Sequence, residues 1–109
     1  MSGQILIDEL VTKIDAGAVV LLEALPPEYF ARGHLPSAKS LPLGELERLA
    51  PEVIPDTSAE VVVYCSGPTC NNSHVAQRRL ASLGYEHVRV FSGGKAAWIE
   101  SGRALEVTP

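Results

Sequence analysis

Residues 61–65 read Val-Val-Val-Tyr-Cys, and this stretch decides how the rest of the chain is interpreted. An uninterrupted apolar run rich in β-branched residues predicts a strand that is buried on both faces. The polar segment 66–72 that follows predicts a loop, and apolar residues at helical spacing predict a helix over 73–83. Gly84 stands where a glycine commonly ends such a helix. A buried strand that leads through a loop into a helix is the building unit of a parallel α/β sheet.

The same alternation of apolar strands and amphipathic helices extends in both directions from this unit. Further strands are predicted over 18–22, 38–41 and 88–91. Further helices are predicted over 8–16, 28–32, 43–49 and 95–100. We therefore expect one α/β domain with a mainly parallel sheet flanked by helices.

Length and composition restrict the function classes. A chain of 109 residues with 46% hydrophobic residues is long enough for one domain with its own core. The net charge of −4 argues against a nucleic-acid partner, and the apolar runs are too short to cross a bilayer. The first residues, Met1-Ser2-Gly3-Gln4, lack the basic start of a signal peptide. We expect a cytoplasmic protein with no membrane partner, whose two cysteines are free thiols.

Cys65 is the main candidate for chemistry because it follows the predicted buried strand directly. Ligands of open α/β sheets bind at the carboxyl ends of the strands. The start of the next helix offers unpaired backbone N–H groups and the positive end of a dipole, which stabilise an anion. The position therefore predicts a thiol with a lowered pKa that acts as a nucleophile. The alternative from local context is a buried cysteine that only packs.

Four segments of the chain together resemble the rhodanese-like domain (sulfurtransferase) family over about residues 5–106. They are Glu-Tyr-Phe-Ala-Arg-Gly-His-Leu-Pro-Ser-Ala at 28–38, Val-Val-Val-Tyr-Cys at 61–65, Leu-Ala-Ser-Leu-Gly-Tyr at 80–85 and Gly-Gly-Lys-Ala-Ala-Trp at 93–98. The resemblance implies a single rhodanese-like domain over residues 1–109, with a five-stranded, mainly parallel sheet. It also implies that Cys65 carries sulfane sulfur as a persulfide. The partners would then be a small sulfane-sulfur donor and a thiol or protein acceptor, with no metal and no organic cofactor.

The loop after Cys65 is expected to hold the persulfide through backbone N–H groups, with Ser73 as the N-cap of the helix. The expected substrate-binding residues are Ser66, Gly67, Pro68, Thr69, Cys70, Asn71, Asn72 and Ser73, of which Pro68 has no N–H to donate. The loop is longer than is usual in the family and contains no Arg or Lys. Because thiosulfate is a dianion, we expect it to be a poor donor here.

Cys70 lies in the same loop and leaves several hypotheses open. It can act as a resolving thiol, form a reversible disulfide with Cys65 in a redox or binding module, or have no role. As primary nucleophile it is disfavoured, since only two residues separate it from the predicted helix. A zinc site built from Cys65, Cys70 and His74 lacks an evident fourth ligand. A thioredoxin-type motif needs closer cysteines, and a phosphatase-type loop favours an Arg where Asn71 stands.

Overall fold

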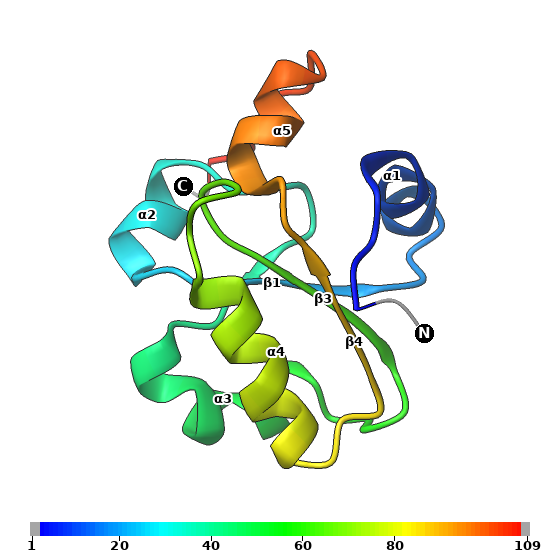
Figure 1. Ribbon diagram of the computed structural model, residues 1–109, viewed down its shortest axis with the longest axis vertical. Helices are drawn as coiled ribbons and strands as arrows, with labels where there is room; N and C mark the ends of the chain where they lie inside the picture. The colour runs from blue at the N-terminus through cyan, green and yellow to red at the C-terminus, as the bar shows by residue number, and fades with distance from the viewer. Residues whose placement is uncertain (1–2, 108–109) are drawn as a thin grey trace.

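The computed structural model describes residues 3–107 and has a central parallel sheet of four strands. The strands are β1 (Val20–Glu23), β2 (Lys39–Ser40), β3 (Glu60–Tyr64) and β4 (His87–Phe91). Their order across the sheet is β2-β1-β3-β4, and every pair is parallel (Figure 1). The α/β class and the parallel sheet are as predicted from the sequence. The two ends of the expected domain, residues 1–2 and 108–109, lie outside the described residues.

Helices cover both faces of this sheet (Figure 1). They are α1 (Ile7–Asp15), α2 (Pro27–Arg32), a short 3₁₀ segment η1 (Leu43–Glu45), α3 (Leu46–Val53), α4 (Asn72–Ser82) and α5 (Gly94–Glu100). One core cluster joins α3 and α4 to the sheet, and a second joins α1 and α5 to its opposite face. The central strands β1 and β3 therefore lie between two apolar layers, which is why residues 18–22 and 61–64 read as continuous apolar runs.

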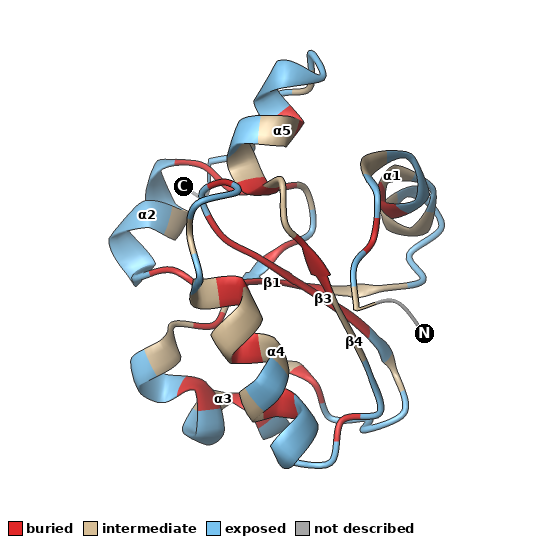
Figure 2. Ribbon diagram, viewed as in Figure 1, coloured by how far each residue is buried: buried red, intermediate tan, exposed pale blue. Residues whose placement is uncertain are grey.

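The central strand β3 divides its side chains between the two layers. Val61 and Val63 pack in the cluster with α3 and α4, whereas Val62 and Tyr64 pack in the cluster with α1. All four are buried, and β3 is red along most of its length in Figure 2. Alternate residues of a strand point to opposite faces, so burial on both sides needs an unbroken apolar run. The predicted strand at 61–64 is thus confirmed.

The fifth strand that the resemblance implied is not formed within the described residues, where the free edge of β4 has a single isolated bridge instead. Gln4 forms an isolated parallel bridge with Val90 at the free edge of β4. The Ile5 N–H donates to the Val90 carbonyl at 3.0 Å, and the Val90 N–H donates to the Gly3 carbonyl at 2.7 Å. Because α1 begins at Ile7, too few residues remain before it to continue the ladder. The expectation of five strands was wrong by this one element, and the fold class is unaffected.

Helix α4 differs from the prediction at its start and matches it at its end. It begins at Asn72 with Asn71 as N-cap, so the prediction of Ser73 as N-cap was wrong. Ser73 instead lies buried in the first turn. At the other end Gly84 has a φ of +102°, which a glycine adopts without steric strain. The Gly84 N–H donates to Ala81 and the Tyr85 N–H to Leu80, the hydrogen-bond pattern of a Schellman cap.

A buried polar group connects β1, β3 and the loop before β2. Glu23 is fully buried, and its Oε1 accepts a hydrogen bond of 2.8 Å from the Tyr64 hydroxyl. The same hydroxyl accepts a 3.1 Å hydrogen bond from the Leu35 N–H. Burial and the nearby Glu23 carboxylate raise the pKa of Tyr64, so the phenol stays protonated. Tyr64 thus satisfies two buried polar groups at once.

Tyr64→Phe should therefore destabilise the fold more than Tyr85→Phe does. Removing the Tyr64 hydroxyl leaves Glu23 Oε1 and the Leu35 N–H unpaired, at about 1–3 kcal/mol for each buried group. The Tyr85 hydroxyl serves only the Ile54 carbonyl, at 2.8 Å, so its loss leaves one such group. Urea unfolding of both variants measures the difference. Equal losses of unfolding free energy would contradict the assigned role of Tyr64.

Candidate active site

Cys65 lies directly after β3, at the carboxyl edge of the sheet and in the middle of its strand order. Its side chain is buried, with 1% of the residue surface exposed, and Cys70 is half-buried in the loop that leads to α4. Both are free cysteines. The strand-end position predicted for Cys65 is the one that the structure shows.

The Cys65 sulfur is surrounded by polar groups of the loop and of α4. Cys65 Sγ lies 3.3 Å from the Cys70 carbonyl oxygen and 3.4 Å from Ser73 Oγ, both within reach of its S–H. The Ser73 backbone N–H also donates to this sulfur. The first turn of α4 therefore contacts the thiol, as expected for a cysteine that faces a helix start.

The pKa of Cys65 is nevertheless raised, which corrects the sequence-based expectation of a lowered value. Burial is the largest cause, and the hydrogen bond that the Cys65 thiol donates to the Cys70 sulfur raises the pKa further. The Ser73 hydroxyl and N–H lower it only in part. The sequence showed the helix start but not the loss of hydration, and here the loss of hydration dominates.

Cys70 holds the more acidic thiol of the pair. Partial burial opposes its ionisation, but hydrogen bonds from the Cys65 thiol, the Asn72 N–H and the Ser66 N–H outweigh it and lower the pKa of Cys70. The Ser66 hydroxyl adds a further donor. The cradle of hydrogen-bond donors that the sequence predicted around Cys65 thus converges on the Cys70 sulfur. The two thiols form one unit in which Cys65 donates and Cys70 accepts.

The expected binding loop divides into residues that face the sulfurs and residues that do not. Ser66, Asn72 and Ser73 donate to one sulfur or the other. The Cys70 N–H is used in a turn, since it donates to the Gly67 carbonyl at 3.1 Å. The remaining members, Pro68, Thr69 and Asn71, are exposed to solvent.

Helix α5 fixes the start of this loop. The Lys95 N–H donates to the Cys65 carbonyl at 3.1 Å, and the Ala96 N–H donates to the Ser66 carbonyl at 3.0 Å. Gly94 permits this approach, because a Cβ there would lie 2.3 Å from the Cys65 carbonyl oxygen and 2.9 Å from the Gly67 nitrogen. In the sequence, Gly94 stands out only as part of the segment 93–98 that resembles the family. Its contact with the loop is long-range and leaves no local signal.

A buried ion pair lies beside the loop, at the ends of β1 and α5. Lys95 Nζ lies 3.1 Å from Glu23 Oε2 and donates to the Tyr29 carbonyl at 3.0 Å. The Asn72 side chain donates to the Ala24 carbonyl at 3.0 Å, which joins α4 to the same strand end. Sequence reasoning missed Lys95, although it directly follows the Gly93-Gly94 pair. Since Glu23 neutralises Lys95, the pair adds no net positive charge to the site.

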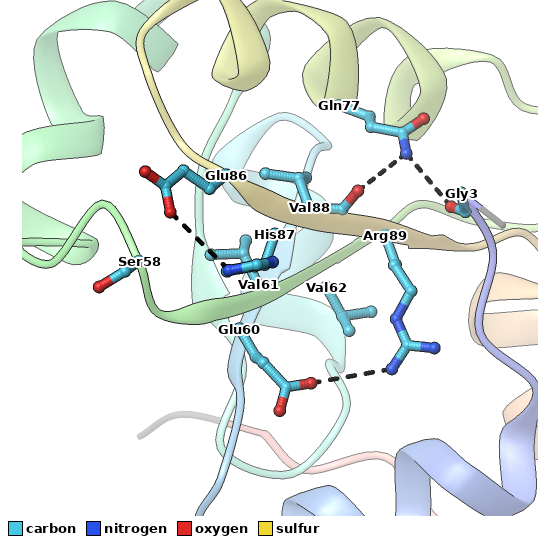
Figure 3. A pocket seen from close by; sticks show the side chains of 10 residues that line it. All are labelled: Gly3, Ser58, Glu60, Val61, Val62, Gln77, Glu86, His87, Val88 and Arg89. Carbon is cyan, nitrogen blue, oxygen red and sulfur yellow. Dashed lines mark hydrogen bonds and ion pairs between the residues drawn. The ribbon is translucent and has the colours of Figure 1, made fainter. Parts of the chain in front are cut away.

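A separate cavity of about 520 Å³ opens at the opposite, amino-terminal end of β3 and β4 (Figure 3). It is lined by Gly3, Ser58, Glu60, Val61, Val62, Gln77, Glu86, His87, Val88 and Arg89. The Gln77 amide donates to the Gly3 and Val88 carbonyls, and Arg89 pairs with Glu9 and Glu60. Cys65 follows the other end of β3, so this cavity is distinct from the sulfur site.

Within residues 3–107, no three or more His, Cys, Asp and Glu side chains are grouped closely enough to hold a metal ion. The hypothetical zinc site of Cys65, Cys70 and His74 is therefore not formed. Over the same range, no helix combines the length and hydropathy that crossing a membrane requires.

The site combines three features. The domain is a parallel α/β fold, a cysteine follows its central strand β3, and the loop after this cysteine leads into a helix. The model of the rhodanese-like domain family matches residues 6–101, and the chain belongs to that family. The resemblance of its four sequence segments is thereby confirmed.

Individual relatives and solved structures are similar to most of this chain. The chain is 32% identical over 98 residues to the HTH-type transcriptional regulator Rv0324 of Mycobacterium tuberculosis, covering 90% of this chain and 42% of that protein. It spans less than half the length of the curated relatives it matches. The rhodanese-like domain of an Anabaena protein superimposes with a TM-score of 0.85 at 27% identity, covering 99% of this chain and 81% of that one. A human single-domain sulfurtransferase, TSTD1, shares the fold with a TM-score of 0.81 at 24% identity, covering 92% and 97%.

Gly94→Ala should disturb the loop, whereas the matched variant Gly102→Ala should not. Both glycines have positive φ, +60° and +87°, so an added Cβ costs each about 1–2 kcal/mol. Only at Gly94 does the new Cβ also meet the Cys65 carbonyl, and Gly102 has open space. Urea unfolding and the rate of thiol alkylation measure the two effects. We expect a larger stability loss and an altered alkylation rate for Gly94→Ala alone. Identical results for both variants would refute the contact.

Proposed function

We propose that the chain is a sulfurtransferase that moves sulfane sulfur through a persulfide on Cys65. In the first half-reaction the Cys65 thiolate attacks the outer sulfur of a donor and releases the remainder, for example sulfite from thiosulfate. In the second, a thiol or protein acceptor takes the outer sulfur and restores the thiolate. The observation that carries the proposal is the position of Cys65 at the carboxyl end of the central strand, beside donors from the loop and α4. A sulfurtransferase with the same fold supports it.

Activation of Cys65 follows from its contact with Cys70. The pKa of Cys65 is raised and that of Cys70 is lowered, so Cys65 keeps its proton beside the more acidic Cys70 thiol, with which its side chain interacts. When a donor arrives, this proton passes to the Cys70 thiolate and leaves Cys65 as the nucleophile. Cys70 is in this respect the adjacent base that a buried nucleophile requires. The persulfide that results is held by loop N–H groups that already face the two sulfurs, those of Ser66, Asn72 and Ser73.

Charge at the site favours neutral donors over thiosulfate. The loop contains no Arg or Lys, the nearby Lys95 is neutralised by Glu23, and the chain as a whole carries −4. A dianion would then be bound only by backbone dipoles, whose effect at a helix start is about 0.3–2 kcal/mol. We propose neutral organic polysulfides, such as trisulfides, as the sulfane donors, in a single domain that works without metal or organic cofactor. Two free thiols fit the reducing conditions of the cytoplasm.

A second candidate function uses the same pair of cysteines without sulfur transfer. The interaction between the two sulfurs fits a redox or binding module that switches by a reversible Cys65–Cys70 disulfide. Intact mass after exposure to a sulfane donor separates the two functions. A gain of one sulfur atom supports the transferase, and loss of two hydrogens in an oxidant without sulfane sulfur supports the switch.

Cys65→Ser should abolish sulfur transfer from every donor to a thiol acceptor, because the serine hydroxyl cannot form the persulfide. The matched variant Cys70→Ser should still acquire sulfur on Cys65, more slowly, since it lacks only the neighbouring base. The assay measures sulfur delivered to the acceptor, together with the mass of the protein. Substantial turnover by Cys65→Ser would sink the proposal.

Asn71→Arg should improve thiosulfate use selectively. Asn71 is exposed, and within the described chain its side chain makes no capping hydrogen bond to α4, so the substitution removes no known contact. An exposed charge of this kind is worth about 0.5–1 kcal/mol, or roughly two- to fivefold in rate. Asn71→Glu should act in the opposite direction, and neither variant should change the use of a neutral organic trisulfide. The same change with both donors would show that charge does not limit the reaction.

A further inference from the structure

The Cys70 sulfur occupies the part of the site where a transferred sulfur would be expected. The Ser66 N–H, the Ser66 hydroxyl and the Asn72 N–H converge on this sulfur. Cys65 Sγ lies 3.3 Å from the Cys70 carbonyl oxygen, and the Cys65 thiol interacts with the Cys70 side chain as well. The donors that would stabilise the outer sulfur of a Cys65 persulfide thus already hold a second cysteine sulfur in contact with the first.

Contact of this kind is what displacement at sulfur requires. A thiolate opens a disulfide or persulfide by direct attack on one of its two sulfurs, and the other leaves. The Cys70 N–H and the Gly67 carbonyl close a turn, and the Cys70 carbonyl oxygen lies 3.3 Å from Cys65 Sγ, so the loop folds back onto Cys65. Cys65 is almost fully buried, whereas Cys70 is only half-buried. An internal nucleophile therefore lies against Cys65, which external thiols reach with difficulty.

We infer that Cys70 is a resolving thiol that attacks the inner sulfur of the Cys65 persulfide and releases the outer sulfur as hydrosulfide. The inference rests on the proposed function, since it requires the persulfide. It adds a second outcome to the reaction, in which sulfane sulfur is reduced to hydrosulfide instead of being transferred to a thiol or protein acceptor.

The step balances without a further reactant. The proton that Cys70 takes from Cys65 in the first half-reaction passes to the outer sulfur, which leaves a Cys70 thiolate beside a protonated persulfide. A bond forms between the two cysteine sulfurs, and the bond between Cys65 and the outer sulfur breaks with its electron pair on the outer atom. The outer sulfur gains two electrons as hydrosulfide, and each cysteine sulfur loses one. An external thiol then reopens the disulfide for the next cycle.

The chemistry of the pair fits this direction of attack. A thiol attacks best when its pKa is near the ambient pH, and the pKa of Cys70 is lowered toward that range. The loop residues at 69 and 71 are exposed, so a thiol at either place would lack the donors that Cys70 has. Only residue 70 carries its sulfur into contact with Cys65 within the described loop.

The test compares the wild-type protein with Cys70→Ser under anaerobic conditions, with excess thiosulfate and no added thiol. Thiosulfate is chosen because its transfer releases sulfite and adds no background of sulfide. We expect the wild type to release close to one sulfide per chain and to lose two hydrogens in mass. Cys70→Ser should release at least about tenfold less sulfide and retain one added sulfur atom on Cys65. The matched control, Cys70→Ser combined with Asn71→Cys, keeps a thiol in the loop and should behave like Cys70→Ser.

The outcomes separate this inference from the proposed function. Retention of the same added sulfur by wild type and Cys70→Ser, with equal sulfide release, would overturn the resolving role and leave the transferase intact. Rapid sulfide release by the relocated thiol of the control would show that any loop thiol suffices, and would also overturn it. If Cys70→Ser acquires no sulfur at all over a long incubation, Cys65 forms no persulfide. That result contradicts the proposed function and, with it, the resolving role of Cys70.

Discussion

The pairing of β3 between β1 and β4 is the constraint on which the rest of this structure depends. Register places Tyr64 beside Glu23 on one side and beside Phe91 on the other, so all three strands end at the same edge. Burial of β3 on both faces leaves it one register, because a shift by one residue would exchange its two apolar layers. Strand β3 therefore ends at Tyr64, and Cys65 is the first residue of the loop that forms the candidate site.

Three neighbouring elements then determine the shape of the loop. Helix α5 holds the Cys65 and Ser66 carbonyls, the Asn72 side chain holds the end of β1, and Gly94 allows the close approach. The arrangement brings two sulfurs to one set of donors. It also pairs Lys95 with a buried carboxylate, so the site has a cradle for an anion and little net charge. A site of this kind suits a thiolate or persulfide better than a free dianion.

Local patterns in the sequence predict much of this fold, and long-range contacts account for what they miss. The buried strand at β3, the helix after it and the Gly84 cap are signals within a few residues of one another, and each is confirmed. Helix α3 continues through Pro51 to Val53, beyond the predicted end at residue 49, and Leu46 and Ala50 on it are buried against the sheet. The raised pKa of Cys65 was missed because burial of a thiol depends on the whole domain. The choice of Cys65 as nucleophile stays a prediction.

The claim that two thiols share one set of donors is open to a direct measurement, the pH titration of thiolate absorbance in the ultraviolet. We expect two separate steps in the wild type, because the pKa of Cys70 is lowered and that of Cys65 is raised from the ordinary thiol value. The early step should vanish in Cys70→Ser and persist, shifted upward, in Cys65→Ala, which lacks the donor side chain. A single wild-type step near the ordinary value would contradict the account, as would an early step that survives in Cys70→Ser.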